Sequence, residues 1–251
     1  MAIRLLLFDL DGTLIDSRSD IAAALNGMLV RYGIPPLDEG RILSFVGRGI
    51  RSFVTQALSA VGVESVSGPE FPATIAGSFP TSAVGVESVS GDEAVEAFSD
   101  EYGKRLLDRT VLYPGVAETL PLLRPARMAV VSNKPGDFIE RILQGLGIRP
   151  YFEIIIGGDS PAGIKPSPGP FIAALARTAI PASEALVVGD SPYDIAAAKA
   201  AGIRCCAALY GFHPVAELIP HEPDFTIETF ADLLEIADSR GPSLLRGSGF
   251  S

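Results

Sequence analysis

The feature of this sequence that most constrains its fold is the alternation of short apolar runs with helical patterns. Five runs have the length and composition of buried strands, at residues 3–8, 127–131, 152–156, 185–188 and 203–209. Helical patterns that open with Pro or Ser separate the later runs, at residues 135–147, 168–179 and 191–202. This alternation predicts an α/β fold with a Rossmann-like, doubly wound parallel sheet, whose ligands bind beyond the carboxyl ends of the strands.

A long helical region interrupts this alternation between the first and second strands. Residues 16–33 end on Gly33 and begin with Ser17 three residues before Asp20, which is a weak form of a helix-capping box. Residues 92–110 carry one apolar helical stripe, formed by Val95, Phe98, Tyr102 and Leu106. We therefore expect an α-helical cap domain at 16–110, inserted into a core made of 1–15 and 111–238, and a flexible tail at 239–251.

The ten-residue segment SAVGVESVSG occurs twice, at 59–68 and at 82–91. Two copies are too few for a solenoid, which needs about three units to bury a continuous core. Removing 23 residues, 69–91, leaves an ordinary connection between two helices, so we interpret 59–91 as a partial duplication within the helical region. Extra loop length costs little free energy, so tolerance is favoured over a role in shaping the site.

Composition narrows the classes of function. A net charge of −10 and a pI near 4.7 argue against a nucleic-acid partner, because binding a phosphate backbone needs clustered Lys and Arg. No run is long enough to cross a membrane, and the adjacent Cys205 and Cys206 lie in a predicted buried strand rather than in a disulfide framework. We expect a globular, cytoplasmic protein.

Polar side chains follow four of the predicted strands. Any one of them alone is commonplace, for example as a turn residue, a helix cap or a solvated lysine. Their placement at one edge of a parallel sheet is less commonplace, and four converging carboxylates require a cation. An oxygen-rich set without sulfur suits Mg²⁺. The set consists of Asp9, Asp11, Ser132, Lys165, Asp190 and Asp194.

These segments resemble, in the same order, the motifs of the haloacid dehalogenase superfamily, in its phosphoglycolate phosphatase-like branch. The motifs are DLDGT at 9–13, VVSNK at 130–134, IKPSP at 164–168 and GDSPYD at 189–194. The resemblance extends over nearly the whole chain, and the complete set is far more specific than any single motif. It implies an enzyme that hydrolyses a small phosphorylated metabolite, with the helical insertion as a mobile cap.

The resemblance implies a role for each motif residue. Asp9 would be the nucleophile that forms an aspartyl-phosphate, and Asp11 would act as general acid and base. Mg²⁺ would be held by Asp9, the backbone carbonyl of Asp11 and Asp190, with Asp194 supporting the metal site. The remaining two catalytic positions, Ser132 and Lys165, would bind the phosphoryl oxygens.

Further residues are weaker candidates. Arg48 lies between two glycines of the cap, in FVGRGIRSFV, where the resemblance implies a loop that meets the substrate, and its guanidinium suits a carboxylate. An ordinary helix connection with a solvated Arg is the alternative. Asn133 and Lys134 adjoin Ser132 and are candidates for binding phosphate or substrate. His213 and His221 lack ligand spacing and are expected at the surface.

The substrate indicated best by the resemblance is 2-phosphoglycolate. Other phosphates within the family, such as nucleotides, sugar phosphates and pyrophosphate, stay open, as does a sugar phosphomutase that would use the same Asp9 and Asp11. A non-catalytic binding protein with this fold is disfavoured, because it would have no need for so many mutually repelling carboxylates. The chain could act as a monomer or as a homodimer.

Overall fold

The computed structural model describes residues 2–66 and 88–238, and its centre is a six-stranded sheet in which all neighbouring strands are parallel. The order across the sheet is β10-β9-β8-β1-β6-β7. The prediction of a doubly wound α/β fold is thereby confirmed. The strands are β1 (Leu5–Phe8), β6 (Arg127–Val131), β7 (Ile154–Ile156), β8 (Ala185–Gly189), β9 (Arg204–Ala208) and the edge strand β10 (Phe225–Ile227), which was not predicted.

Helices cover both faces of this sheet. Because side chains alternate along a strand, Leu6 and Phe8 of β1 belong to one apolar cluster and Leu5 and Leu7 to another, on the opposite face. The first face is covered by α6 (Gly136–Gly145) and α10 (Leu233–Asp238), and the second by α7 (Gly169–Thr178), α8 (Pro192–Ala200) and α9 (Val215–Leu218). The core also contains α5 (Val116–Thr119) and the 3₁₀ helices η1 (Arg149–Tyr151), η2 (Ala182–Glu184), η3 (Ile219–His221) and η4 (Phe230–Asp232).

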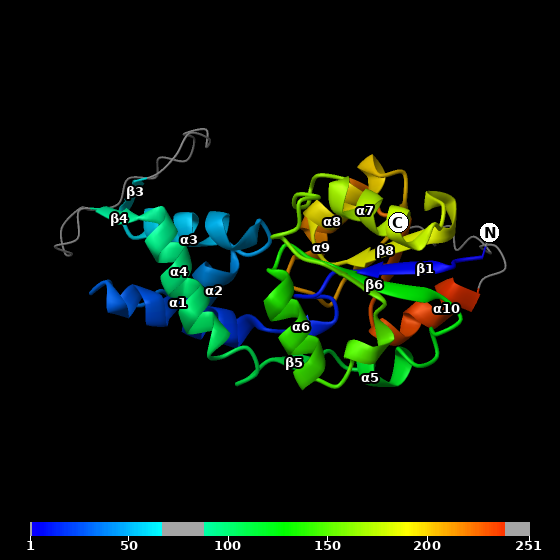
Figure 1. Cartoon of the computed structure of the whole chain (residues 1–251), viewed down its shortest axis with the longest axis horizontal. Helices are drawn as coiled ribbons and strands as arrows, with labels where there is room; N and C mark the ends of the chain where they lie inside the picture. The colour runs from blue at the N-terminus through cyan, green and yellow to red at the C-terminus, as the bar shows by residue number, and fades with distance from the viewer. Residues whose placement is uncertain (1, 67–87, 239–251) are drawn as a thin grey trace, which may run out of the picture.

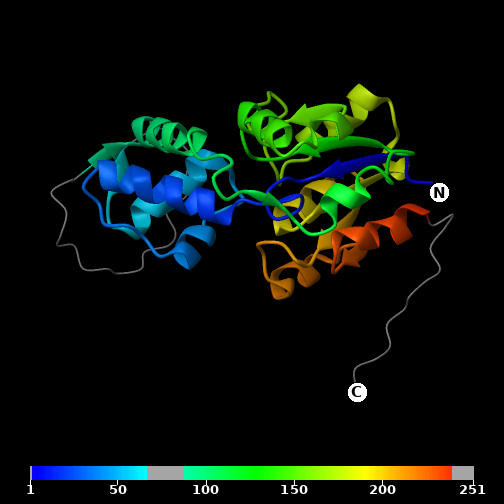
Figure 2. The ribbon, with the colours of Figure 1, turned by 90° about the horizontal axis from the view of Figure 1, so that it is seen from below.

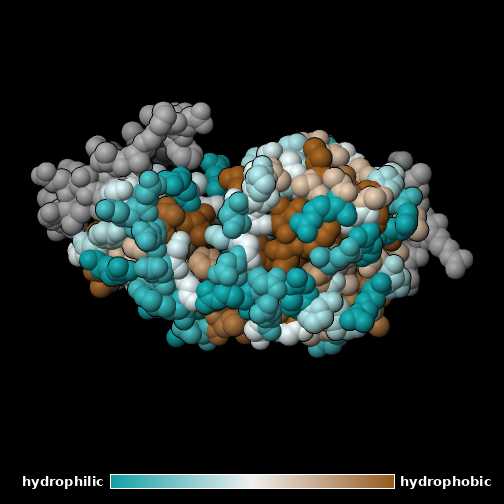
Figure 3. Space-filling view, viewed as in Figure 1, coloured by the Kyte–Doolittle hydropathy of each residue, from teal (hydrophilic) through white to brown (hydrophobic). Residues whose placement is uncertain are grey.

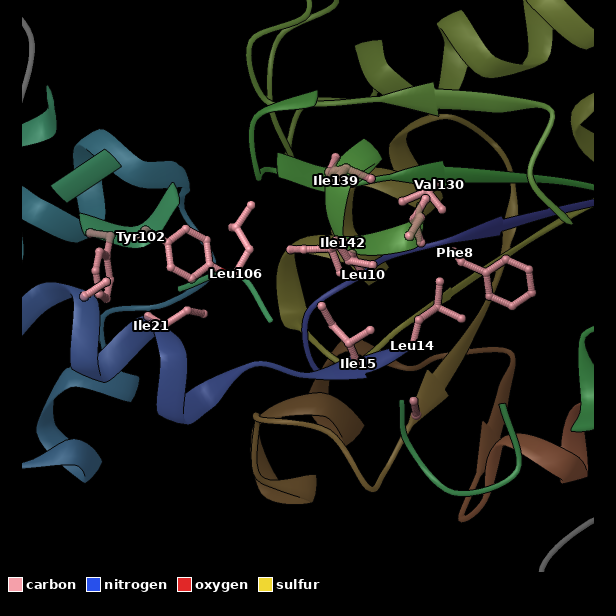
Figure 4. Packing of buried hydrophobic residues seen from close by; sticks show 14 of the residues in the cluster. Phe8, Leu10, Leu14, Ile15, Ile21, Tyr102, Leu106, Val130, Ile139 and Ile142 are labelled. Atoms are coloured by element: carbon pink, nitrogen blue, oxygen red, sulfur yellow. The ribbon is translucent and has the colours of Figure 1, made fainter. Parts of the chain in front are cut away.

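The helices inserted after β1 form a separate lobe, to the left of the sheet in Figure 1 and Figure 2. They are α1 (Arg18–Arg31), α2 (Glu39–Leu43), α3 (Gly49–Ala60) and α4 (Gly91–Gly103). Three residues of the predicted apolar stripe, Phe98, Tyr102 and Leu106, are buried. Figure 4 shows Tyr102, Leu106 and Ile21 of this lobe beside core residues such as Leu10 and Ile15, all within one apolar cluster.

The two chain segments that join the lobes run side by side. β2 (Ile15–Asp16) pairs in antiparallel fashion with β5 (Val111–Leu112). Next to them the carboxylate of Asp20 is buried and accepts hydrogen bonds from the backbone N–H groups of Arg109 (3.0 Å) and Thr110 (2.8 Å) and from the Thr110 hydroxyl (2.7 Å). Asp20 therefore ties the entry to the cap and its exit together.

The predicted capping box at the start of α1 is wrong. Ser17 makes no side-chain cap hydrogen bond, and Asp20 bonds across the hinge rather than to the helix start. The Ser17 hydroxyl instead donates to the carboxylate of Asp11, just after β1. Ser17 and Asp20 therefore bond to residues distant from the helix start, Asp11 and Thr110, rather than to each other's backbone. The spacing of the two residues along the chain does not reveal these partners.

The two copies of the repeated segment meet at the end of the cap that is remote from the core (Figure 1). β3 (Glu64–Val66) lies in the first copy and β4 (Ser88–Ser90) in the second, and they pair as a two-stranded parallel sheet. The register joins Glu64 to Ser88 although the identical residue of the second copy is Glu87, so the copies pair one residue out of step. The rest of the expected insertion, at 67–87, and the expected tail at 239–251 lie outside the described residues.

The described part of the chain contains no helix long and apolar enough to cross a membrane. On the face shown in Figure 3 hydrophilic residues cover much of both lobes, and hydrophobic residues show between them, mainly over the core. The adjacent Cys205 and Cys206 of β9 are buried and form no disulfide, as the sequence predicts.

Candidate active site

A pocket lies between the cap and the carboxyl edge of the sheet. Its core wall holds most of the polar groups that the sequence singles out, whereas its cap wall is mainly apolar. The core contributes Asp9, Asp11, Ser132, Asn133, Lys134, Lys165, Asp190, Ser191, Phe212 and His213, and the cap contributes Ile21, Val46, Gly47, Gly49, Ile50, Phe53, Phe98 and Tyr102. All the predicted core site residues line this pocket except Asp194, which is in contact with Lys165 of the lining.

Asp9 stands at the end of β1, where its backbone N–H donates to Val188 O of the neighbouring strand at 2.9 Å. The residue is only 9% exposed, and burial raises its pKa to about 6 against the opposing charge of Lys165. The nearby carboxylates of Asp194 and Asp11 act in the same direction as burial. Asp9 is therefore a carboxylate held at a site that disfavours its charge, which is the condition under which a bound cation stabilises it.

Lys165 connects the carboxylates of this edge. Its ammonium lies 2.8 Å from Asp9 Oδ1 and 2.5 Å from Asp194 Oδ1, and it donates to Val131 O at 2.9 Å. Burial by itself would lower the pKa of Lys165, but the two carboxylates outweigh burial and raise it. The side chain is therefore a fixed positive charge beside Asp9.

Asp194 is positioned by the start of α8. Ser191 is the N-cap of this helix, and the Asp194 carboxylate accepts from the Ser191 backbone N–H at 3.1 Å, which completes a capping box. The same carboxylate binds Lys165. One residue thus orients the helix start and the lysine together.

Asp9, Asp190 and Asp194 each offer a carboxylate oxygen, and these oxygens lie within 4.8 Å of one another. Asp9 Oδ1 is buried and accepts no well-directed hydrogen bond, so a lone pair is left for a cation. An all-oxygen set of this kind fits Mg²⁺. The cluster can hold a divalent cation.

Two glycines make room for the Asp190 carboxylate. A Cβ at Gly12 would lie 2.1 Å from Asp190 Oδ2, and a Cβ at Gly211 would lie 2.2 Å from Asp190 Cβ. Gly12 also has φ +84°, a conformation that disfavours other residues. The carboxylate accepts from Thr13 Oγ1 at 3.2 Å and from Phe212 N at 2.7 Å, and burial raises its pKa.

Asp11 faces the cap. Its Oδ1 accepts from Lys134 Nζ at 2.6 Å and from the Ser17 hydroxyl. Lys134 Nζ is also 2.6 Å from the hydroxyl of Tyr102, a buried residue of α4. Burial raises the pKa of Tyr102 to about 12 and opposes the charge of Lys134, whose pKa is nevertheless raised by Asp11 and Tyr102. Asp11, Lys134 and Tyr102 therefore form one chain of contacts from core to cap.

Ser132 and Asn133 follow β6 but have different surroundings. Ser132 is buried and lines the pocket, and its hydroxyl accepts from the Lys134 backbone N–H at 3.4 Å. The Asn133 amide donates to Gly47 O (2.8 Å) and Lys165 O (2.9 Å) and accepts from Lys165 N (2.8 Å). Asn133 thus holds the cap loop and the Lys165 segment, and both of its amide hydrogens are used in doing so.

Arg48 does not take the position expected of a substrate ligand. Its Nε donates to the hydroxyl of Tyr193 at 2.8 Å, and its guanidinium lies 5.3 Å from the centre of the Tyr193 ring. Its neighbours Gly47 and Gly49 line the pocket, whereas the Arg48 side chain does not. In this structure Arg48 fastens the cap loop to α8.

The sequence analysis does not assign several residues to the site, among them His213, Tyr102 and Tyr193. His213 was expected at the surface, but it lines the pocket with Nδ1 3.6 Å from Asp190 Oδ2. Burial opposes its charge, yet Asp190 raises the pKa of His213. Its position shortly after β9 could have indicated that it lies near the carboxyl edge of the sheet. The sequence places Tyr102 only on an apolar helical stripe, and it gives no indication for Tyr193. Their contacts could not be predicted because cap and core meet only in the folded chain.

The comparisons with known proteins agree with this geometry. The profile of the haloacid dehalogenase-like hydrolase family matches residues 6–208. Phosphoglycolate phosphatase of Pectobacterium atrosepticum is 38% identical over 237 residues, which cover 94% of this chain and 92% of that protein. Phosphoglycolate phosphatase 1 of Pseudomonas aeruginosa is 34% identical, over 99% of this chain and 85% of that protein.

A solved structure shows the same arrangement of the chain. The crystal structure of a predicted phosphoglycolate phosphatase from Haemophilus somnus superposes with a TM-score of 0.78 at 30% identity, covering 93% of this chain and 97% of that one. The profile match and these relatives extend over both lobes and all four motifs. This chain belongs to the haloacid dehalogenase-like hydrolase family.

Proposed function

We propose that this phosphoric monoester hydrolase is a Mg²⁺-dependent phosphatase whose substrate is 2-phosphoglycolate. The observation that carries the reaction class is the environment of Asp9, a buried carboxylate at a strand end, 2.8 Å from Lys165 and clustered with Asp190 and Asp194. The substrate is supported by relatives named phosphoglycolate phosphatase that are 34–38% identical over most of the chain.

Asp9 begins the reaction as the nucleophile. A carboxylate oxygen of Asp9 attacks phosphorus, the bond to the ester oxygen breaks, and Asp11 gives a proton to the departing glycolate oxygen. Asp11 then takes a proton from water, whose oxygen attacks the phosphorus of the aspartyl-phosphate, and Asp9 is regenerated with release of phosphate. The position of both residues at the end of β1 places them on the same side of the pocket.

The other site residues reduce the repulsion between the Asp9 carboxylate and the negatively charged phosphate. Asp9, Asp190 and the backbone carbonyl of Asp11 would hold Mg²⁺, which when bound lowers the repulsion between a carboxylate and a phosphate dianion. Asp194 supports this set through Ser191 and Lys165. Lys165 and Ser132 bind phosphoryl oxygens, and their rigid, buried positions avoid reorganisation as charge develops.

The test is a panel of kcat/KM values on the purified protein. The panel compares 2-phosphoglycolate with ethyl phosphate, a sugar phosphate, a nucleotide and pyrophosphate, each with Mg²⁺ and with EDTA. We expect Mg²⁺-dependent release of phosphate and the highest value for 2-phosphoglycolate. A higher value for another ester would reassign the substrate, and no Mg²⁺-dependent release from any ester would favour a binding protein.

A phosphomutase is the competing reaction. It uses the same Asp9 and Asp11 but returns the phosphoryl group to a sugar, so product analysis with glucose 1-phosphate separates the two reactions. We expect glucose and phosphate rather than an isomeric sugar phosphate. A monomeric or homodimeric state and a cytoplasmic location stay predictions, which size-exclusion chromatography with light scattering and cell fractionation test.

A further inference from the structure

The pocket holds few cations for a substrate that carries two anionic groups. Among the described residues that line it, the lysines are Lys134 and Lys165, and there is no arginine. Lys165 already forms ion pairs with Asp9 and Asp194, and it donates hydrogen bonds to Asp194 and to Val131 O. Lys134 has contacts to Asp11 and Tyr102, which occupy two of its three hydrogens.

Chemistry fixes where the second anion of such a substrate lies. In 2-phosphoglycolate a single methylene group separates the carboxylate carbon from the ester oxygen. The ester oxygen must meet Asp11, because Asp11 protonates it. A cation that touches Asp11 is therefore next to the substrate carboxylate as well, and Lys134 Nζ is 2.6 Å from Asp11 Oδ1.

The surroundings of Lys134 strengthen such a contact. The lysine is 8% exposed, and the cap wall of the pocket includes Ile50, Phe53 and Phe98. A charge pair in a site that excludes water is worth more than the same pair in solvent. The Tyr102 hydroxyl, 2.6 Å from Lys134 Nζ, offers a second polar group at the same point.

We propose that Lys134, together with the Tyr102 hydroxyl of the cap, binds the carboxylate of the leaving group and so sets the preference of the enzyme for a carboxylate-bearing phosphate ester. This inference rests on the proposed function. It gives the cap a direct part in selection, because Tyr102 belongs to α4 and meets Lys134 only when cap and core are docked.

The experiment compares two esters of similar size that differ in the carboxylate, 2-phosphoglycolate and ethyl phosphate. Steady-state kcat and KM are measured for wild type, Lys134→Met, Tyr102→Phe and, as a matched control, Lys199→Met, whose side chain is 44% exposed on α8. We expect Lys134→Met to lower the ratio of kcat/KM for the two esters about 100-fold, mainly through KM for 2-phosphoglycolate. Tyr102→Phe lowers the ratio about 5-fold, and Lys199→Met leaves it unchanged.

Each other outcome has a defined meaning. Equal losses for both esters in Lys134→Met would overturn the proposal, because they would show that Lys134 acts only through Asp11. An unchanged ratio in Tyr102→Phe, which keeps the ring and hence the packing, would remove Tyr102 from it. If Lys134→Met does not fold, as judged by circular dichroism, Tyr102→Phe alone decides. Failure of the proposed function is visible separately, as a wild type that hydrolyses ethyl phosphate without preferring 2-phosphoglycolate.

Discussion

The two walls of the active-site pocket are built on different principles. On the core side, each charged group is fixed by partners, as Lys165 is by Asp9, Asp194 and Val131. On the cap side, most lining residues are apolar, and the polar contacts across the gap number few, such as those of Tyr102 with Lys134 and of Arg48 with Tyr193. The charged groups therefore come from the core, and the cap adds an apolar enclosure with single polar groups such as the Tyr102 hydroxyl.

The largest expected effect is the loss of activity when a charged group of the core wall is replaced. Asp9→Asn removes the proposed nucleophile while keeping its size, so kcat should fall by about 10⁴-fold or more for every ester. Turnover with 2-phosphoglycolate and p-nitrophenyl phosphate measures it. Asp137→Asn, on the exposed side of α6, is the control and should retain wild-type activity. A loss restricted to one ester would contradict the assignment of Asp9 to the chemical step.

The hinge between the lobes should show the next largest effect, on stability. Asp20→Ala leaves the N–H groups of Arg109 and Thr110 and the Thr110 hydroxyl without their buried acceptor, and we expect a loss of about 3 kcal/mol in the free energy of unfolding. Urea denaturation measures it, with exposed Asp137→Ala as the control, expected within about 0.5 kcal/mol of wild type. A loss as small as that of the control would show that the hinge does not depend on this carboxylate.

The charge of Asp9 should couple stability to pH in the core. Because the folded-state pKa is raised from 3.8 to about 6, the contribution of Asp9 is fully present below pH 3.8 and is lost as pH rises through 6. Without metal, wild type should lose about 2–3 kcal/mol relative to Asp9→Asn between pH 4 and 7.5. Urea denaturation of both proteins in EDTA measures the difference, and Mg²⁺ at pH 7.5 should restore wild type. Parallel pH profiles for the two proteins would contradict the raised pKa.

The cap loop should give a smaller effect. Arg48→Ala removes the contact with Tyr193 that docks this loop, so KM should rise about 3- to 10-fold for esters with and without a carboxylate alike. The comparison is with Arg51→Ala, whose partner Asp92 lies elsewhere in the cap. An increase in KM for 2-phosphoglycolate alone would instead make Arg48 the ligand of the substrate carboxylate, as the family resemblance implies.

The smallest effect is expected at the far end of the cap. Deleting residues 69–91 removes the second copy of the repeat together with β4, which lies at the end of the cap that is remote from the sheet (Figure 1). We expect kcat/KM to stay within about twofold of wild type across the ester panel, because a change in loop length costs little free energy. A change in the ranking of the esters would show that the repeat helps to shape the cap.

The sequence predicts the core of the molecule far better than its cap. Five of the six strands were predictable from their apolar runs. The motif residues were predictable because strand ends in a parallel sheet converge at one edge, so position along the chain fixes position in space. The edge strand β10 forms no continuous apolar run, because the exposed Thr226 separates Phe225 from Ile227. Several contacts could not be predicted, because each contact joins two chain segments whose relative position depends on how the cap packs on the core. They are the contacts of Ser17, Asp20, Tyr102 and Arg48.

The antiparallel pairing of β2 with β5 has a consequence for how such enzymes diversify. Because Ile15 pairs with Leu112, the chain leaves the core and returns to it at one point. The whole cap is therefore an insertion whose two ends are adjacent. Another cap could be grafted at these positions without rebuilding the sheet or moving Asp9. Exchanging the cap between relatives would then replace the cap's share of the substrate contacts, such as that of Tyr102, while Lys134 and the catalytic groups of the recipient core stay in place.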